Sequence, residues 1–145
     1  MITIENYWMG RDVAHAADLT PEIRANAQVT VERCNKLLDL AGGGKTHVVT
    51  SGWRPLSRNS RTAGASTTSK HLSAEAADIS DDDRYLADWS VANLDVLEEV
   101  GIWMEDPRWT PSWVHWQIIP PKSGRRIYIP SLAKPLDPDY PVTWA

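Results

Sequence analysis

The segment from residue 21 to residue 41 constrains the fold most, because it carries the longest clear period in the chain. Its apolar residues recur every three or four positions, which places them on one face of a helix. Thr20 is a good N-cap, Pro21 suits the first helical position, and three glycines from Gly42 onward end the pattern. The sequence therefore predicts a helix over 21–41. The residues on its apolar face are Ile23, Ala27, Val31, Cys34, Leu38 and Ala41.

Short segments rich in β-branched or aromatic residues follow this helix and predict strands. A second helix is predicted over 84–100, with the acidic residues 81–83 as its caps. Helices and strands segregate rather than alternate strictly, which indicates an α+β fold with a small antiparallel sheet and flanking helices. The predicted strands are 46–50, 76–79, 102–104, 113–119 and, after a turn, 125–129.

The 145-residue length predicts one domain over 1–145. Residues 1–19 are expected to form an N-terminal arm, and the proline-rich residues 130–145 an extended C-terminal tail. The region 51–70 shows no period and predicts a long loop. Loops of that length in small domains are often functional.

Composition excludes several classes of function. A net charge of -4 argues against nucleic acid as the main partner. No apolar run is long enough to enter a membrane, and the N-terminus lacks the pattern of a signal peptide, so we expect a chain made in the cytoplasm. The single cysteine excludes an internal disulfide and a zinc cluster built from thiolates.

Three residues form a candidate metal site: His71, Asp78 and His115. Two neutral imidazoles and one carboxylate are a standard set of zinc ligands, and three protein ligands leave a position open for catalysis. The spacing alone is more typical of a loop histidine and a helix-capping aspartate. The residues by themselves leave both interpretations open.

Side chains alternate across a strand, which assigns faces to the candidate ligands. If residues 74–79 are extended, Asp78 shares a face with Ala74 and Ala76, whose small side chains leave room beside a metal. His115 shares a face with Trp113 and Gln117. The intervening residues Val114, Trp116 and Ile118 are then expected to point into the core.

Three blocks resemble the M15 peptidases: Ser-Gly-Trp-Arg at 51–54, Ser-Lys-His-Leu-Ser-Ala-Glu-Ala-Ala-Asp at 69–78, and Trp-Val-His at 113–115. This family includes zinc D-alanyl-D-alanine carboxypeptidases and dipeptidases, and phage L-alanyl-D-glutamate endolysins. The resemblance covers about residues 46–119, with the blocks in the family's order. It implies a fold like that of hedgehog and the D,D-peptidases.

The resemblance implies that His71, Asp78 and His115 hold Zn²⁺. It also implies that Arg54 contacts substrate and stabilises charge in the transition state, which suits a permanently charged, fork-shaped donor. Ser69 matches the serine before the first ligand and is expected to contact substrate or orient its loop. Trp113 and Gln117, which share the face of His115, are expected to contact substrate as well.

The chain departs from the family pattern at the catalytic acid. Several branches place Glu or Asp three residues before the last histidine, where this chain has Ser112, and another branch has His-x-Asp, where it has Gln117. The nearest acids are Glu105 and Asp106. We predict Glu105 as the proton acceptor, because an aspartate before proline is typical of a turn.

A second departure is Ala74, which stands in place of the family's glycine. We expect a strand to accept that change.

The resulting hypothesis is a monomeric peptidase acting on peptidoglycan peptides, of the phage or prophage endolysin type, released to the wall by a pore-forming holin. One alternative is a degenerate module that binds wall peptide or glycan without cleaving it, which Ser112 and the Trp-rich stretch 89–116 motivate. Another is a virion component with this fold. A carboxypeptidase would need to bind a terminal carboxylate, for which Arg58 or Arg61 are candidates.

Overall fold

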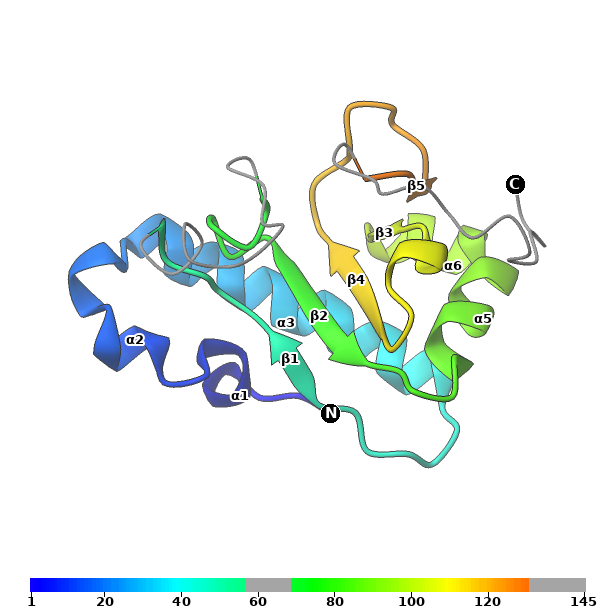
Figure 1. Cartoon of the computed structure of the whole chain (residues 1–145), viewed down its shortest axis with the longest axis horizontal. Coiled ribbons are helices and arrows are strands. Elements are labelled where there is room, and N and C mark those ends of the chain that lie inside the picture. Colours follow the sequence, from blue (N-terminus) through cyan, green and yellow to red (C-terminus); the bar gives the residue numbers. More distant parts are fainter. Residues whose placement is uncertain (57–68, 131–145) are drawn as a thin grey trace.

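Five strands form one mixed sheet in the order β1-β2-β4-β3-β5 (Figure 1). The computed structural model describes residues 1–56 and 69–130. The α+β fold with flanking helices is confirmed. The strands are β1 (Val49–Ser51), β2 (Ala76–Ser80), β3 (Trp103–Glu105), β4 (Trp113–Gln117) and β5 (Ile127–Tyr128). The helices are α1 (Ile4–Trp8), α2 (Arg11–Ala14), α3 (Pro21–Ala41), α5 (Tyr85–Ala92) and α6 (Leu94–Val100), with short 3-10 turns η1 (Ala16–Asp18) and η2 (Pro107–Trp109).

The centre of the sheet is the antiparallel pair β2 and β4, in which Asp78 lies directly opposite His115. β1 and β3 join this pair on either side, also antiparallel. The edge strand β5 runs parallel to β3, with Glu105 opposite Tyr128. This parallel edge departs from the purely antiparallel sheet predicted by the sequence.

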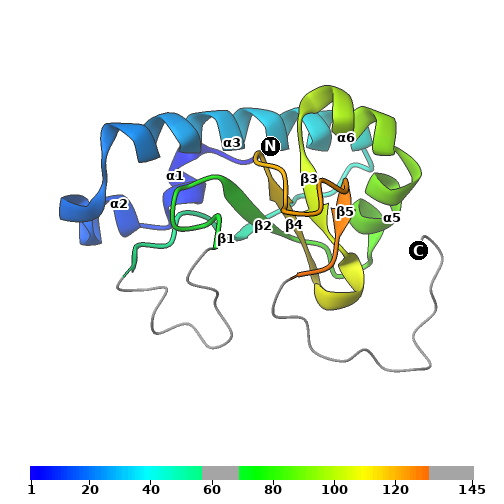
Figure 2. The ribbon, with the colours of Figure 1, turned by 90° about the horizontal axis from the view of Figure 1, so that it is seen from above.

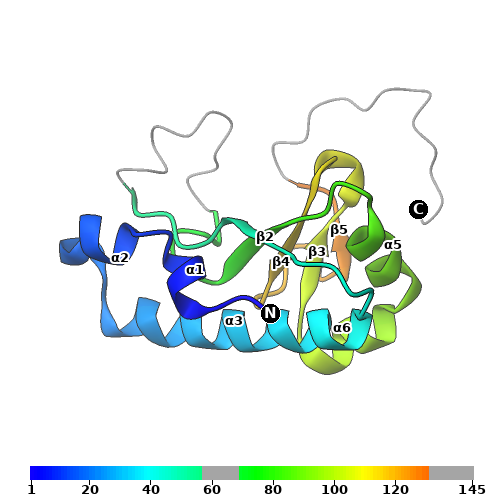
Figure 3. The ribbon, with the colours of Figure 1, turned by 90° about the horizontal axis from the view of Figure 1, so that it is seen from below.

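The helix α3 has the predicted bounds and lies along one face of the sheet (Figures 2 and 3). Its buried residues include Ala27, Val31, Cys34 and Leu38, as its period predicts. The strand residues that alternate toward the core are also buried, namely Ala77, Ile79, Met104, Val114 and Trp116. Because side chains alternate along a strand, Asp78 and His115 point to the opposite face.

The second predicted helix is divided at Asn93 into α5 and α6. The backbone of Asn93 leaves the helical region with φ -129° and ψ 47°, and its side-chain amide donates to the carbonyl of Trp89 at 2.7 Å. An asparagine side chain that bonds locally to the backbone competes with helix continuation. Leu94, the first residue after this break, is 42% exposed.

The N-terminal segment 1–19, expected as an arm, instead folds and packs against the sheet. Tyr7 on α1 is fully buried and donates its hydroxyl to the carbonyl of Ala76 on β2 at 2.7 Å. Arg11 on α2 donates to the carbonyl of Trp53 at 2.9 Å. This segment therefore supports the residues that follow β1.

Within the described ranges, no helix is both long and apolar enough to cross a membrane. Of the predicted C-terminal tail, residues 131–145 lie outside the described residues, as do Arg58 and Arg61.

Candidate metal centre

His71 lies in a compact turn just before β2. The amide of Leu72 donates to the carbonyl of Ser69, and the amide of Glu75 donates to the carbonyl of Lys70. The turn reverses the chain at Ala74, whose φ of 60° lies in the left-handed region.

This geometry corrects the expectation that Ala74 is part of the strand beside Asp78. Left-handed backbone disfavours any residue with a Cβ, by about 1–2 kcal/mol. The glycine of the family pattern therefore has a conformational reason, and this chain replaces it with alanine.

The Ser-Gly-Trp-Arg segment holds this turn from the other side. The carbonyl of Gly52 accepts from Nδ1 of His71 at 2.8 Å, and the amide of Arg54 donates to the carbonyl of His71 at 3.0 Å. Position 52 admits only glycine, because a Cβ there would lie 2.0 Å from the carbonyl oxygen of Tyr7. The segment thus fixes His71 largely through backbone atoms.

Three side chains converge where this turn meets β2 and β4. Oδ1 of Asp78 lies 3.3 Å from Nε2 of His71 and 2.9 Å from Nδ1 of His115. One donor atom from each residue lies within 4.8 Å of the other two. The structure therefore brings together all three of the ligands implied by the resemblance, although they come from a turn and two separate strands.

The donor set fits zinc. His71 directs Nε2 toward Asp78 while its Nδ1 bonds to Gly52, and His115 directs Nδ1 toward Asp78 while its Nε2 lies 2.9 Å from Oε1 of Gln117. A metal-binding histidine typically bonds its outer nitrogen in this way. The Asp78 side chain remains 20% exposed, so the cluster is accessible from outside.

The charges in the cluster are strongly coupled. Burial pushes the pKa of Asp78 upward, but the charges of and hydrogen bonds from His71 and His115 outweigh it and hold that pKa well below its usual range. Burial would lower the pKa of His115, but its bond to Asp78 and the charge of Asp78 raise it to about 9. Without a metal, this arrangement favours a proton on His115, and a divalent cation would take the place of that positive charge.

Glu105 lies on β3, the neighbour of β4. The pairs Trp103–Gln117 and Met104–Trp116 set a register whose next position brings Glu105 opposite His115. Asp78, His115 and Glu105 therefore form a row of neighbouring residues across the adjacent strands β2, β4 and β3. Burial raises the pKa of Glu105, the charge of His115 opposes that rise, and the charge of Asp78 adds to it.

The neighbouring Asp106 has a structural role. Its carboxylate accepts from the backbone amide of Arg108 at 3.0 Å and pairs with the guanidinium of the same residue. It caps the 3-10 turn η2 that begins at Pro107. This arrangement matches the turn interpretation of Asp106 and leaves Glu105 as the acid that is electrostatically coupled to His115.

Arg54 and Ser69 are bonded to each other beside the cluster. Nη2 of Arg54 donates to Oγ of Ser69 at 3.0 Å, and that hydroxyl also accepts from the amide of His71 at 3.3 Å. Burial lowers the pKa of Arg54, and the charge of Asp78 acts in the opposite direction. Ser69 therefore orients both Arg54 and the His71 turn, and a contact of either residue with substrate stays a prediction.

The remaining predicted residues lie on β4 or just before it. Trp113 is half-buried and lies opposite Ser80, so its contact with substrate stays a prediction. Gln117 is only 3% exposed and bonded to His115, which places it behind the ligand rather than in front of substrate. Ser112 is exposed, and its carbonyl accepts from the amide of Asp81 at 2.9 Å.

Two residues near the cluster were not predicted from the sequence. Tyr128 on β5 donates its hydroxyl to Oε1 of Gln117 at 2.6 Å. Tyr7 excludes a side chain at position 52 and bonds to β2. Neither residue belongs to a motif. The only signal in the sequence is the alternation along the predicted strand 125–129, which allows the side chain of Tyr128 to point inward.

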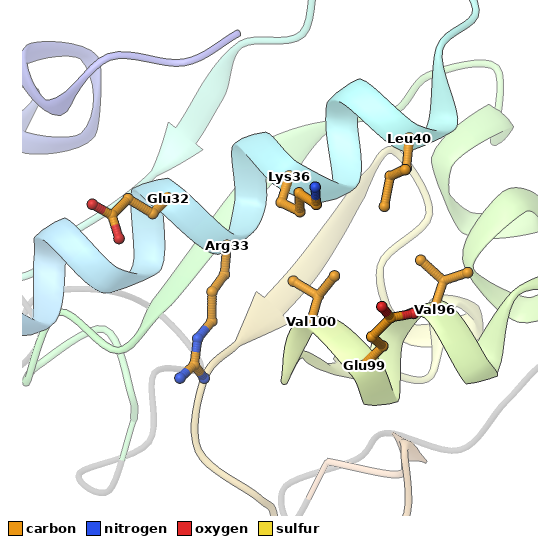
Figure 4. Close-up of a pocket in the computed structure, with 7 residues that line it drawn as sticks. All are labelled: Glu32, Arg33, Lys36, Leu40, Val96, Glu99 and Val100. Carbon is orange, nitrogen blue, oxygen red and sulfur yellow. The ribbon is translucent and has the colours of Figure 1, made fainter.

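A pocket of about 430 Å³ lies elsewhere, between α3 and α6 (Figure 4). It shares no residue with the metal cluster, and its lining contains neither histidine nor cysteine. Both acidic and basic side chains surround a few aliphatic ones. The lining residues are Glu32, Arg33, Lys36, Leu40, Val96, Glu99 and Val100.

Comparison with known families identifies the family of this chain. The model of the family described as Peptidase M15 matches residues 11–108, more than half of the chain. The chain therefore belongs to the peptidase M15 family. The match includes Arg54, His71, Asp78 and Glu105 and ends before His115. No curated protein and no solved structure matches the chain.

Proposed function

We propose that this protein is a zinc-dependent peptidase that hydrolyses the stem or cross-link peptides of bacterial peptidoglycan, as a phage or prophage endolysin does. The observation that carries the proposal is the convergence of His71, Asp78 and His115 within 4.8 Å in a chain of the peptidase M15 family. Two imidazoles and one carboxylate are a ligand set of catalytic zinc sites, which keep one position open.

When bound by these three side chains, zinc would lower the pKa of a water molecule and polarise the scissile carbonyl. The protein has to supply a proton acceptor beside that position. Glu105 suits this task because it lies in register with His115 and its pKa is raised by burial. A raised pKa brings a carboxylate closer to the pH at which an enzyme works, which suits a group that first accepts a proton and then donates it.

Glu105 takes a proton from the attacking water and passes it to the leaving nitrogen. In this scheme the acid comes from β3 instead of from the residue three positions before His115. Ser112 is exposed and has no carboxylate, so it does not take part in proton transfer.

Arg54 is the proposed contact for negative charge. Its guanidinium is held by Ser69 and lies close enough to Asp78 for the two charges to affect each other. A fixed, planar donor of this kind binds a substrate carboxylate or an oxyanion that develops at the scissile carbonyl.

The proposed function also implies where the protein is made and where it acts. We propose that the chain is made in the cytoplasm, reaches the wall through a holin, and acts there as a monomer on peptidoglycan peptides. The choice between endopeptidase and carboxypeptidase depends on which new termini the enzyme releases.

Digestion of purified peptidoglycan tests the proposal. The zinc-loaded protein is expected to release new amino groups, and the masses of the fragments identify the bond. Release should stop with a chelator and in His115→Ala, and should return when zinc is restored to the wild type only. A mutant of a partly exposed histidine outside the cluster, His15→Ala, would serve as a matched control and should retain activity.

Two results would contradict the proposal in different ways. Release that resists the chelator would exclude a metal-dependent mechanism. A folded protein that binds zinc but cleaves no wall type would favour the non-cleaving binding module, and binding of the same protein to wall fragments would then identify its ligand.

A further inference from the structure

Gln117 is a buried side chain whose hydrogen bonds fix its orientation. Its Nε2 donates to the carbonyl of Ile119 at 2.7 Å, and its Oε1 accepts from the hydroxyl of Tyr128 at 2.6 Å. Reversal of the amide would place its oxygen against the carbonyl oxygen of Ile119, where both groups are acceptors. The oxygen of Gln117 therefore faces His115.

This orientation determines which nitrogen of His115 keeps its proton when the ring is neutral. Nε2 of His115 lies 2.9 Å from Oε1 of Gln117, and an amide oxygen can only accept, so Nε2 must donate. Nδ1 faces Asp78 at 2.9 Å and, without a metal, donates a second proton to that carboxylate; loss of this proton frees the lone pair of Nδ1 and not that of Nε2. The hydrogen bond from Nε2 to Gln117 thus leaves Nδ1 as the nitrogen of His115 that can bind a metal.

His71 shows the mirror arrangement. Its Nδ1 donates to the backbone carbonyl of Gly52 at 2.8 Å, which leaves Nε2 toward Asp78. The two histidines therefore use opposite ring nitrogens, each selected by a neutral carbonyl oxygen. For His71 the oxygen belongs to the backbone, but for His115 it belongs to a side chain that can be replaced.

Tyr128 adds a second layer of support from the edge of the sheet. It pairs with Glu105 through the parallel strands β3 and β5, and its ring lies edge-on to that of His115 with centroids 6.4 Å apart. The hydroxyl of Tyr128 holds Gln117, and Gln117 holds His115. A chain of three side chains therefore connects β5 to the metal cluster.

We propose that Gln117 is the positioning residue for His115, with Tyr128 as its support, and that the pair selects Nδ1 of His115 as a zinc ligand. This inference rests on the proposed zinc site. It assigns Gln117 a role in metal binding and not in substrate contact. Loss of an outer partner of a metal-binding histidine typically costs about 10–100-fold in metal affinity or activity.

The test is the zinc affinity of the whole chain, measured by competition with a chromophoric chelator. Gln117→Leu keeps the approximate volume and removes the acceptor, and should weaken zinc binding by about 10–100-fold. Gln117→Glu keeps an acceptor oxygen for His115 but loses the donor to the carbonyl of Ile119, and should recover only part of that loss. Tyr128→Phe should weaken binding in the same direction but by less.

Tyr85→Phe is the matched control for Tyr128→Phe. It also removes one tyrosine hydroxyl that bonds to an oxygen acceptor, the carbonyl of Ala41, at a place away from the cluster. Its zinc affinity should equal that of the wild type. If Gln117→Leu does not fold, the difference between Tyr128→Phe and Tyr85→Phe carries the test.

Nuclear magnetic resonance of the histidine rings in the zinc-loaded wild type gives a readout independent of activity. Long-range proton–nitrogen correlations should show the proton of His115 on Nε2 and zinc on Nδ1. Equal zinc affinity in wild type, Gln117→Leu and Tyr128→Phe would overturn this inference alone. Absence of zinc binding by the wild type would overturn the proposed function and this inference with it.

Discussion

His71 and His115 meet at the same aspartate but are supported by two different regions of the protein. The His71 turn is held by backbone atoms of residues 52 and 54 and lies inside the family match. His115 is held by the side chains of Gln117 and Tyr128, on strands beyond the end of that match. The backbone carbonyl of Gly52 needs no side chain, and close packing even excludes one there, whereas the support of His115 depends on the polar groups of two side chains. The β4–β5 side of the site therefore depends on side chains that lie outside the family match.

The largest effect is expected at Asp78, because it contacts both regions. Asp78→Asn should lower zinc affinity by more than about 100-fold, since loss of an outer partner alone costs up to about that much. Wall-degrading activity should fall with it. Chelator competition measures the affinity, and Asp88→Asn on the exposed face of α5 provides the control. Wild-type affinity in Asp78→Asn would exclude it as a ligand.

The next largest effect is expected at Glu105 on β3, where a mutation should impair proton transfer without impairing metal binding. Glu105→Gln should lower kcat by about 10²–10⁴-fold, as loss of a general base does, while zinc affinity stays near that of the wild type. Asp106→Asn should leave kcat within a few-fold, because its carboxylate caps η2. Steady-state kinetics on a defined stem peptide would compare the two variants. Full activity in Glu105→Gln would show that another group accepts the proton.

Arg54→Lys tests the side of the site that contains the His71 turn. It keeps the positive charge but loses the planar fork, and we expect kcat/KM to fall by about 10²-fold, similar to the loss of one oxyanion donor. Zinc affinity should not change, because Arg54 donates to Ser69 and not to a ligand atom. Arg24→Lys on the exposed part of α3 is the control. A parallel loss of zinc would indicate a structural role for Arg54.

The pH dependence of stability follows from the coupled pair at the junction of the two regions. The pKa of His115 rises from 6.5 to about 9 in the folded metal-free protein, so its contribution is present below pH 6.5 and is lost as the pH rises toward 9. The pKa of Asp78 is lowered, so its contribution is present above pH 3.8 and is lost at lower pH.

Denaturant unfolding with a chelator present should therefore show a free energy of unfolding that falls between pH 6.5 and 9. His115→Ala should lack this decline. Zinc affinity should show the opposite trend and rise over the same interval, because zinc competes with the proton on His115. An identical decline of stability in His115→Ala would assign it to other groups.

The smallest effect is expected at Ala74, in the His71 turn. Ala74→Gly removes the steric strain of a Cβ at a backbone φ of 60°, but it also gives the unfolded chain more conformational freedom. The free energy of unfolding should therefore stay unchanged or rise by up to about 1 kcal/mol. Ala77→Gly in β2, where the backbone is extended, should lower it by about 1 kcal/mol. Thermal unfolding compares the two, and equal destabilisation would argue against strain at Ala74.

Sequence reasoning was most reliable where a local pattern decides the structure. The period and caps of residues 21–41 predicted α3 to the residue, because its ends are set by Thr20 and Gly42 nearby in the chain. The three predicted ligands belong to recognisable blocks, and alternation along the strand predicted that His115 would point away from the core residues Val114 and Trp116. These features depend on neighbours in sequence.

The features that were missed depend on pairing between distant segments. The bond from Tyr128 to Gln117 requires β5 to lie parallel to β3, which no local pattern specifies. The left-handed turn at Ala74 was hidden because alanine fits a strand pattern as well as a turn. The packing of Tyr7 against Gly52 was missed because residues 1–19 show no sustained period.

X-ray absorption at the zinc edge, on the protein loaded with one equivalent of zinc, would identify the ligand atoms themselves. We expect a four-coordinate shell of nitrogen and oxygen at about 2.0–2.1 Å with two imidazoles and no sulfur. His115→Ala should retain one imidazole at most. A shell without imidazole, or an unchanged spectrum in His115→Ala, would contradict a centre built from His71, Asp78 and His115.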